Sequence, residues 1–340
     1  MSLLLAAVCA GRRGEAGRLS VVAFEATVDG VVAVPRGRRQ LAPEASRAPV
    51  FSPDGRWLAF VRGGDVTLAS LPDPAAEPAA LAPAPELPTG AGYQFDASSS
   101  WIALALEGGV LVVPTTGDAG GGFVPLPAGH RPERLMWSER GSLLAVSARE
   151  PDGSPVAVVL DPGRSRVLAT SPGAEILGVP DDETVWLVGP RAGLPGGEAF
   201  VWRRGGEAAS SFVCPDNHLI LSWVPRRNAV LLVALAEDAG DAADVAIASL
   251  AGDEPRPLIQ GVPGVCDIAV STDGGWVTFL SEEDPLAPFL VSTAPGQAAP
   301  QRVLVGEPAQ RGAGEADADS ELLTEVACVV TPAEGAPWSP

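Results

Sequence analysis

The chain has 340 residues, of which 46% are hydrophobic and 19% are charged, so its composition suits a packed core and not a disordered chain. Its formal net charge is −19, and all 23 of its basic residues are arginine, a usage that is typical of GC-rich bacterial genomes. This acidity argues against a nucleic-acid partner, because phosphates are bound by clustered basic side chains, and it is compatible with a basic protein partner.

The sequence also bears on the cellular compartment. No run of 18 apolar residues is present, so we expect no membrane span. The apolar stretch SLLLAAVCAG at 2–11 is short, and no basic region precedes it, unlike an export signal. We therefore predict a cytoplasmic protein, with the periplasm as the alternative. The four cysteines have neither C-x-x-C nor Cys/His zinc spacing, which favours buried thiols in a reducing compartment at Cys9, Cys214, Cys266 and Cys328, with a disulfide as the alternative.

The first predicted elements are three strands near the N-terminus. Residues 2–8 resemble the strand predicted at 142–148, and further apolar runs follow at 19–26 and 31–35. Asp29-Gly30 joins the last two runs and is a strong hairpin signal.

The next element, FSPDGRWLAFV, begins at Phe51 and is the template for the rest of the chain. It consists of an apolar strand end, a Ser-Pro-Asp-Gly turn and a second apolar strand. The same outline begins again at positions 95, 137, 178, 223 and 270, at intervals of 41 to 47 residues. This period leaves room for about four strands and matches that of a β-propeller blade.

Each unit continues with a third strand, and weaker fourth runs follow, such as 165–170 and 301–306. The third strands are predicted at 65–71, 109–114, 155–161, 199–203, 244–250 and 288–292. Helical periodicity longer than two turns is not apparent.

The C-terminal region supplies one more first strand and its turn, ACVVTPAEG, which ends at Gly335. It follows a Gly/Ala/acidic insertion at about 306–320 that we expect to be flexible. Because no second strand follows it, we predict a composite seventh blade made of residues 2–35 and 322–335, which closes the ring and pairs exposed edges. The alternative is a six-bladed propeller with tails at both ends.

The repeated x-S-P-D-G-x-x-L-A-F hairpins resemble the TolB-type, WD-repeat-like β-propeller family over essentially the whole chain. The Gly-His and Trp-Asp marks of true WD repeats are absent. The resemblance implies a propeller of seven or six blades with a protein-interaction role. The predicted fold is therefore all-β, a single seven-bladed β-propeller domain over 1–340.

Candidate catalytic and metal-binding residues are few. The sequence contains no G-x-S-x-G nucleophile motif for which His130 or His218 could act as the catalytic base, so a structural or solvated role is favoured for both. Cys214 lies four residues before His218 and could pair with it, although a buried cysteine near a loop histidine is the commoner arrangement. The acidic clusters lack the pattern of hard-cation loops, so we predict no metal site and no cofactor. The recurrent tryptophans, by contrast, are explained by packing between blades.

One recurrent feature exceeds this background. The position just after each second strand is charged, which predicts a ring on the face where second-to-third-strand loops emerge. Such a face would suit a partner protein, since arginine is enriched in binding hot spots, although strand ends that leave a core need polar residues in any case. The predicted partner-binding residues are Arg12, Arg13, Arg62, Glu107, Arg149, Arg191, Glu237 and Glu282.

The predicted function is a non-catalytic scaffold or recognition module that binds a protein partner. Two alternatives are a propeller hydrolase or lyase with its site in the central funnel, and a periplasmic TolB-like component. Convergent ionisable groups within hydrogen-bonding reach would favour the enzyme.

Overall fold

A computed structural model gives the structure of the chain. It describes residues 2–11, 17–26, 34–73, 76–83, 92–116, 120–191, 194–206, 209–234, 242–250, 254–263, 265–271, 273–281, 289–294, 301–302 and 322–332. The predicted flexible insertion at about 306–320 lies outside these residues.

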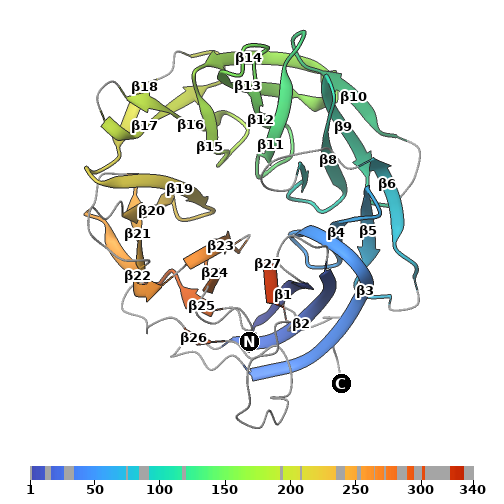
Figure 1. Ribbon diagram of the computed structural model, residues 1–340. Coiled ribbons are helices and arrows are strands. Elements are labelled where there is room, and N and C mark those ends of the chain that lie inside the picture. Colours follow the sequence, from blue (N-terminus) through green and yellow to red (C-terminus); the bar gives the residue numbers. More distant parts are fainter. Residues whose placement is uncertain are drawn as a thin grey trace. The chain divides into compact units, whose positions relative to one another are not determined.

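The described residues form 27 β-strands and one 3₁₀ helix, η1 (Pro162–Arg164), arranged in six sheets (Figure 1). Five sheets have four strands each. In hydrogen-bonded order, the first sheet is β10 (Gly122–Pro125), β9 (Gly109–Pro114), β8 (Trp101–Leu106) and β7 (Tyr93–Phe95), and the second is β11 (Arg131–Trp137), β12 (Leu144–Arg149), β13 (Pro155–Asp161) and β14 (Arg166–Pro172). The third is β15 (Glu175–Gly178), β16 (Thr184–Arg191), β17 (Leu194–Arg203) and β18 (Ala209–Val213), and the fourth is β19 (His218–Val224), β20 (Ala229–Ala234), β21 (Ala242–Ser249) and β22 (Arg256–Pro263). The fifth is β23 (Val265–Val270), β24 (Trp276–Ser281), β25 (Phe289–Ser292) and β26 (Gln301–Arg302). Successive four-stranded sheets of this kind are propeller blades, so the fold is an all-β propeller.

The sixth sheet has seven strands and contains both ends of the chain. Its order is β27 (Leu322–Pro332), β1 (Ser2–Gly11), β2 (Gly17–Ala26), β3 (Val34–Phe51), β4 (Trp57–Arg62), β5 (Asp65–Ser70) and β6 (Ala79–Pro83). Strand β27 pairs antiparallel with β1, from Ser2↔Pro332 to Gly11↔Leu322. The predicted pairing of the two terminal strands in one sheet is thereby confirmed.

The prediction of seven separate blades is wrong, because the described residues form six sheets, the number given in the alternative. The tails that the alternative expected are not observed for 2–11, 17–26 and 322–332, which are strands of the sixth sheet. The reason for six sheets is the 18-residue strand β3. Its first part pairs with β2 as far as Ser46, and its last part, Ser46–Phe51, pairs with β4. The strands expected for the first and the seventh blade therefore form one continuous sheet.

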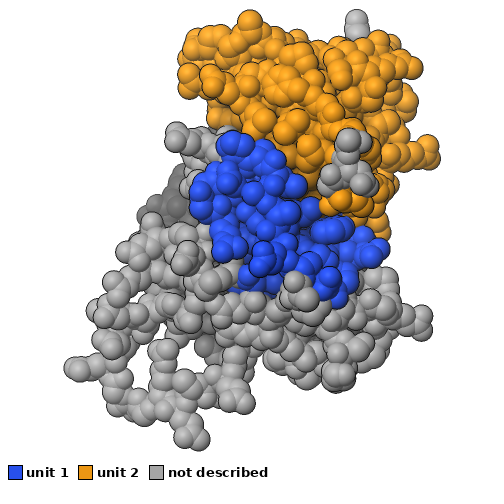
Figure 2. All heavy atoms as spheres, turned by 90° about the vertical axis from the view of Figure 1, so that its right-hand side faces the viewer, with its two compact units in different colours: residues 1–83, 238–244, 257–340 blue, residues 84–237, 245–256 orange. Residues whose placement is uncertain are grey.

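The contacts divide the chain into two compact units, coloured separately in Figure 2. Unit 1 is Met1–Pro83, Asp238–Asp244 and Pro257–Pro340, and unit 2 is Ala84–Glu237 and Val245–Arg256. In unit 2, the first strands β11, β15 and β19 lie on the inner side of their sheets, while β14 and β18 lie on the outer side (Figure 1).

The Ser-Pro-Asp-Gly turn that the sequence repeats has a defined hydrogen-bond pattern. The Ser52 hydroxyl donates to Asp54 Oδ1 (2.6 Å) and accepts from the Trp57 amide (2.9 Å), while Gly55 has a φ of +68°. Ser271 and Asp273 repeat these bonds with distances of 2.6 and 3.0 Å. The side chain thus satisfies a backbone donor that the turn leaves unpaired, which explains why the motif recurs before second strands.

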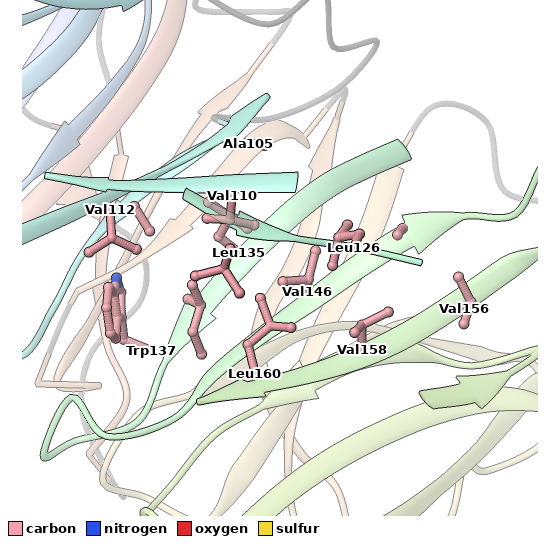
Figure 3. Close-up of a cluster of buried hydrophobic side chains, with 14 residues drawn as sticks. Ala105, Val110, Val112, Leu126, Leu135, Trp137, Val146, Val156, Val158 and Leu160 are labelled. Carbon is pink, nitrogen blue, oxygen red and sulfur yellow. The ribbon is translucent and has the colours of Figure 1, made fainter. Parts of the chain in front are cut away.

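Apolar side chains pack between neighbouring sheets of unit 2. Figure 3 shows the cluster between the sheet of β8 and β9 and the sheet of β11, β12 and β13, which includes Val110, Leu135, Val146 and Val158. Each such fully buried side chain contributes about 1.5–3 kcal/mol. Trp137, Trp186 and Trp223 lie in these inter-sheet clusters, so packing explains them as predicted.

Candidate functional site

The candidate site lies in unit 2, where β12 ends and where β11 and β15 begin. One arginine at this point contacts carboxylates from both first strands. We call the four residues the Arg149 cluster: Glu133, Arg134, Arg149 and Glu175.

Arg149 bridges two sheets. Its Nε donates to Glu133 Oε2 at 3.0 Å within its own sheet, and its Nη2 donates to Glu175 Oε1 of the next sheet at 3.1 Å. All three side chains are partly exposed, so each pair adds only a modest stabilisation of about 0–1 kcal/mol. A guanidinium has five N–H donors, so the bridge leaves donors that an incoming group can reach.

Arg134 lies deeper and holds the edge of β15. Its Nη1 donates to the carbonyl oxygen of Ile176 at 3.5 Å, and the Ile176 amide donates to the buried Ser147 hydroxyl at 2.9 Å. Burial lowers the pKa of the Arg134 guanidinium, and the carboxylate of Glu175 raises it in part, but an arginine stays protonated at neutral pH. The Arg149 cluster therefore has two positive and two negative charges and joins two neighbouring sheets.

A histidine and a carboxylate lie beside this cluster. His130 precedes β11 and Glu150 follows Arg149, and their Nε2 and Oε1 atoms are 3.9 Å apart. His130 Nδ1 lies 3.4 Å from the Ala128 carbonyl oxygen. The Nε2–Oε1 distance of 3.9 Å is too long for a hydrogen bond, so the two side chains lie near one another without being bonded.

The other sequence candidate, Cys214 with His218, is not a nucleophile–base pair. Cys214 is buried, its Sγ donates to the backbone oxygen of His218 at 3.3 Å, and His218 Nδ1 lies 3.0 Å from the Asp216 carbonyl oxygen. Burial raises the pKa of the Cys214 thiol to about 11. The thiol is therefore protonated at neutral pH and lacks the thiolate character that a reactive cysteine needs.

The predicted ring of charged residues is placed only in part. Arg62 ends β4 in unit 1 and is exposed, Glu107 follows β8 and is exposed, and Arg149 ends β12. Arg191 ends β16, but its side chain is outside the described set. The remaining four residues lie outside the described residues: Arg12, Arg13, Glu237 and Glu282. The ring as a whole stays a prediction.

Sequence reasoning missed three members of the cluster, Glu133, Arg134 and Glu175. The local signal was the motif H-R-P-E-R, in which Glu133 and Arg134 stand three and four residues after His130. Glu175 carries no such signal, because only sheet packing places it near Arg149, 26 residues away.

Across the described ranges, no group of three or more His, Cys, Asp or Glu side chains is placed to hold a metal ion. The described part of the chain also contains no helix of sufficient length and apolar character to cross a membrane.

Comparisons with known proteins give the fold but no family. No family model matches the chain, and no curated protein matches its sequence. Among solved structures, the chain is similar to an oligogalacturonate lyase in complex with manganese, with a TM-score of 0.54 and 12% identity over 83% of this chain and 80% of that one. It is also similar to prolyl endopeptidases (TM-score 0.59, 13% identity, 88% of this chain and 49% of that one) and to TolB from Acinetobacter baumannii (TM-score 0.49, 15% identity, 97% and 66%).

These likenesses correct one prediction. The sequence predicted that the chain is not an enzyme, and the comparison contradicts this, because the structures that share its fold include a lyase and endopeptidases. At 12–13% identity the likeness shows the fold alone, and the chain spans about half the length of the prolyl endopeptidase structure. Neither activity is transferred to this chain on that ground.

Proposed function

We propose that the chain is a propeller recognition module that binds a partner protein at the strand ends around the Arg149 cluster. One observation carries the proposal: the Arg149 guanidinium is held between two carboxylates by hydrogen bonds of 3.0 and 3.1 Å and stays partly exposed. An arginine that is fixed before binding loses less side-chain entropy when a partner docks, and arginines of this kind are frequent binding hot spots.

The test uses the full chain and two matched variants. Proteins retained from extracts of the source cells are identified by mass spectrometry, produced as recombinant proteins and titrated against the wild type, Arg149→Gln and Arg140→Gln. Arg140 is exposed in the turn at the opposite end of β12, so it controls for the lost charge. We expect Arg149→Gln to weaken binding at least tenfold, which is about 1.4 kcal/mol, and Arg140→Gln to leave it unchanged.

A photo-crosslinking residue placed at Arg131 should then be captured by the same partner, because Arg131 is exposed and pairs with Arg149 in the sheet register. Binding that is unaffected by Arg149→Gln, with crosslinks from position 140 and none from position 131, would overturn this assignment of the docking face.

A second candidate is a propeller hydrolase or lyase, favoured by the approach of His130 to Glu150 beside partly exposed carboxylates. We expect His130→Gln to abolish turnover found in a screen of ester, peptide and glycan substrates, and the matched His218→Gln variant to retain it. Equal activity of both variants would exclude His130 as the acid–base group.

The compartment stays a proposal as well. We propose a cytoplasmic location and, as the alternative, the periplasm, where the TolB-like role would apply. Fractionation of the source cells, followed by detection with an antibody raised against the chain, distinguishes the two.

A further inference from the structure

A second group of arginines lies at the other end of β13 from the Arg149 cluster. Strand β13 begins at Pro155, which pairs with Arg149, and ends at Asp161, about 20 Å away at the usual rise per residue. Three guanidinium groups surround the Asp161 carboxylate. They come from η1, from the start of β14 and from the residue after β17: Arg164, Arg166 and Arg204.

All three approach the same oxygen atom. Arg204 Nη2, Arg166 Nε and Arg164 Nε lie 3.6, 3.7 and 3.9 Å from Asp161 Oδ2. Charge-assisted N–H···O bonds are about 2.7–2.9 Å long, so these contacts are electrostatic and do not saturate the donors of the guanidinium groups.

The carboxylate is fixed by the backbone. Asp161 Oδ1 accepts from the Arg164 amide at 3.1 Å, where Asp161 caps the 3₁₀ helix. Its side chain is only 11% exposed, whereas those of Arg164, Arg166 and Arg204 are 69%, 50% and 32% exposed. The anion is thus buried beneath cations whose outer faces are open to solvent.

The local charge does not balance. One carboxylate faces three guanidinium groups, in a chain whose net charge is −19. The adjoining turn carries Asp181, Asp182 and Glu183, and the backbone oxygen of Glu183 accepts from the Arg204 amide at 2.8 Å. Asp181 Oδ1 accepts from the Glu183 amide at 2.8 Å, and Asp182 Oδ1 accepts from the Ser142 amide at 3.4 Å, so both carboxylates are hydrogen-bonded to turn backbone. Within the described part of the chain, the Glu183 side chain is exposed and forms no ion pair with the three arginines. Three arginines around one carboxylate leave a local excess of two positive charges.

We propose that Arg164, Arg166 and Arg204 form a binding site for a phosphate-class oxyanion. A phosphate dianion matches the excess of two charges, and its tetrahedral oxygens can accept forked N–H pairs from more than one guanidinium at once. The anion is either free phosphate or a phosphorylated side chain of a partner protein. The site is separate from the Arg149 cluster and does not depend on the function proposed there.

The test measures binding of inorganic phosphate to the full chain by isothermal titration, at constant ionic strength set with chloride. We expect saturable binding that Arg166→Gln weakens at least fivefold and that Arg140→Gln leaves unchanged. Asp161→Asn gives a prediction of the opposite sign, because the amide oxygen can still cap Arg164 while the competing negative charge is gone. That variant should bind phosphate at least threefold more tightly, and circular dichroism verifies that each variant is folded.

The two sources of the anion are separated by a phosphoserine peptide and its unphosphorylated twin. Binding of the phosphopeptide at least tenfold tighter than that of inorganic phosphate indicates a phosphorylated partner, and comparable affinities indicate free phosphate. The proposal is overturned if phosphate binds no better than chloride, or if Asp161→Asn weakens phosphate binding as Arg166→Gln does.

Discussion

The close contact between Gly178 and Trp223 gives a sharp test of how neighbouring sheets of unit 2 pack. Gly178 ends β15, and Trp223 belongs to β19 of the next sheet. A Cβ added at Gly178 would lie 2.5 Å from Cδ2 and 2.7 Å from Cγ of the Trp223 ring. Carbon atoms in good contact are about 3.5–4.0 Å apart, so the ring would have to move by about 1 Å.

The surroundings of Trp223 leave little room for that movement. The ring is buried and stacks on Trp186, with centroids 6.4 Å apart and an interplanar angle of 27°. Overpacking of this kind costs about 1–3 kcal/mol. Replacing a glycine by alanine also stabilises by about 0.4–1 kcal/mol through the unfolded chain, where φ is compatible, as it is at Gly178. We therefore expect Gly178→Ala to lower the free energy of unfolding by about 1–2 kcal/mol.

Gly122→Ala is the matched control, because Gly122 also lies in a strand and its added Cβ would meet no atom within 4 Å. It should leave stability unchanged or raise it by up to about 1 kcal/mol. Urea denaturation followed by circular dichroism and tryptophan fluorescence measures both variants. In a Trp223→Leu background the cost of Gly178→Ala should shrink, which shows that the ring is its cause. Equal stability of the two alanine variants, or a cost that persists without Trp223, would refute the packing argument.

Three further predictions concern the turn, the buried thiol and cooperativity. Ser138→Ala should lower the free energy of unfolding by about 1–3 kcal/mol in urea denaturation, because the Leu143 amide loses the acceptor that it contacts at 3.0 Å. The control Ser100→Ala, at an exposed position, should have little effect, and equal effects of the two variants would contradict the turn's role. Folding raises the pKa of Cys214 from 9.0 to about 11. The protonated thiol therefore contributes fully to the stability of the folded state below pH 9, and this contribution is lost as the pH rises toward 11. Cys214→Ala should flatten that part of the stability–pH curve, and an unchanged decline would rule out this thiol as the cause. If residues 1–340 act as the predicted single domain, calorimetry should show one transition with equal calorimetric and van't Hoff enthalpies, and two separate transitions would contradict it.

Strand positions were largely predictable from the sequence, because each repeat places an apolar run after a recognisable turn. Strands β9 and β13 coincide with the third strands predicted at 109–114 and 155–161. The turn is retained even where its residues change, since Asp96 takes the place of the serine and accepts from the Trp101 amide at 2.8 Å. In four repeats the position therefore holds a side-chain oxygen acceptor and not one residue type, whereas the repeats that begin at 178 and 223 have Val179 and Val224 there.

The strand that joins two expected blades was not predictable in the same way. Residues 34–51 contain prolines, a glycine and several arginines without a period-two apolar pattern, so only a short strand at 31–35 and a separate strand end at Phe51 were expected. The continuity of β3 depends on hydrogen bonds to β2 and β4, which are set by tertiary pairing. Local propensity carries no information about such shared neighbours.

The candidate site, like the fold, was predictable from the sequence only in part. Arg149 was predicted as a charged residue at a strand end, and it lies there. Its two partners are 16 and 26 residues away and become neighbours only through strand register and sheet packing. The sequence therefore predicted the position of the charge but not whether that charge is paired, which decides what it can bind.

The two charged regions of unit 2 differ in that respect, and the difference makes their roles separable. At the Arg149 cluster, two arginines and two glutamates balance, and Arg149 is hydrogen-bonded to both carboxylates across a sheet boundary. Substituting Arg149 therefore removes two partly exposed ion pairs, each worth about 0–1 kcal/mol of stability, as well as any contact with a docked partner. Around Asp161, the arginines exceed the carboxylate in number and contact it only at 3.6 to 3.9 Å, so Arg166 can be substituted with little loss of structure. A change in ligand binding without a change in stability is thus expected at the Asp161 end of β13 and not at the Arg149 end.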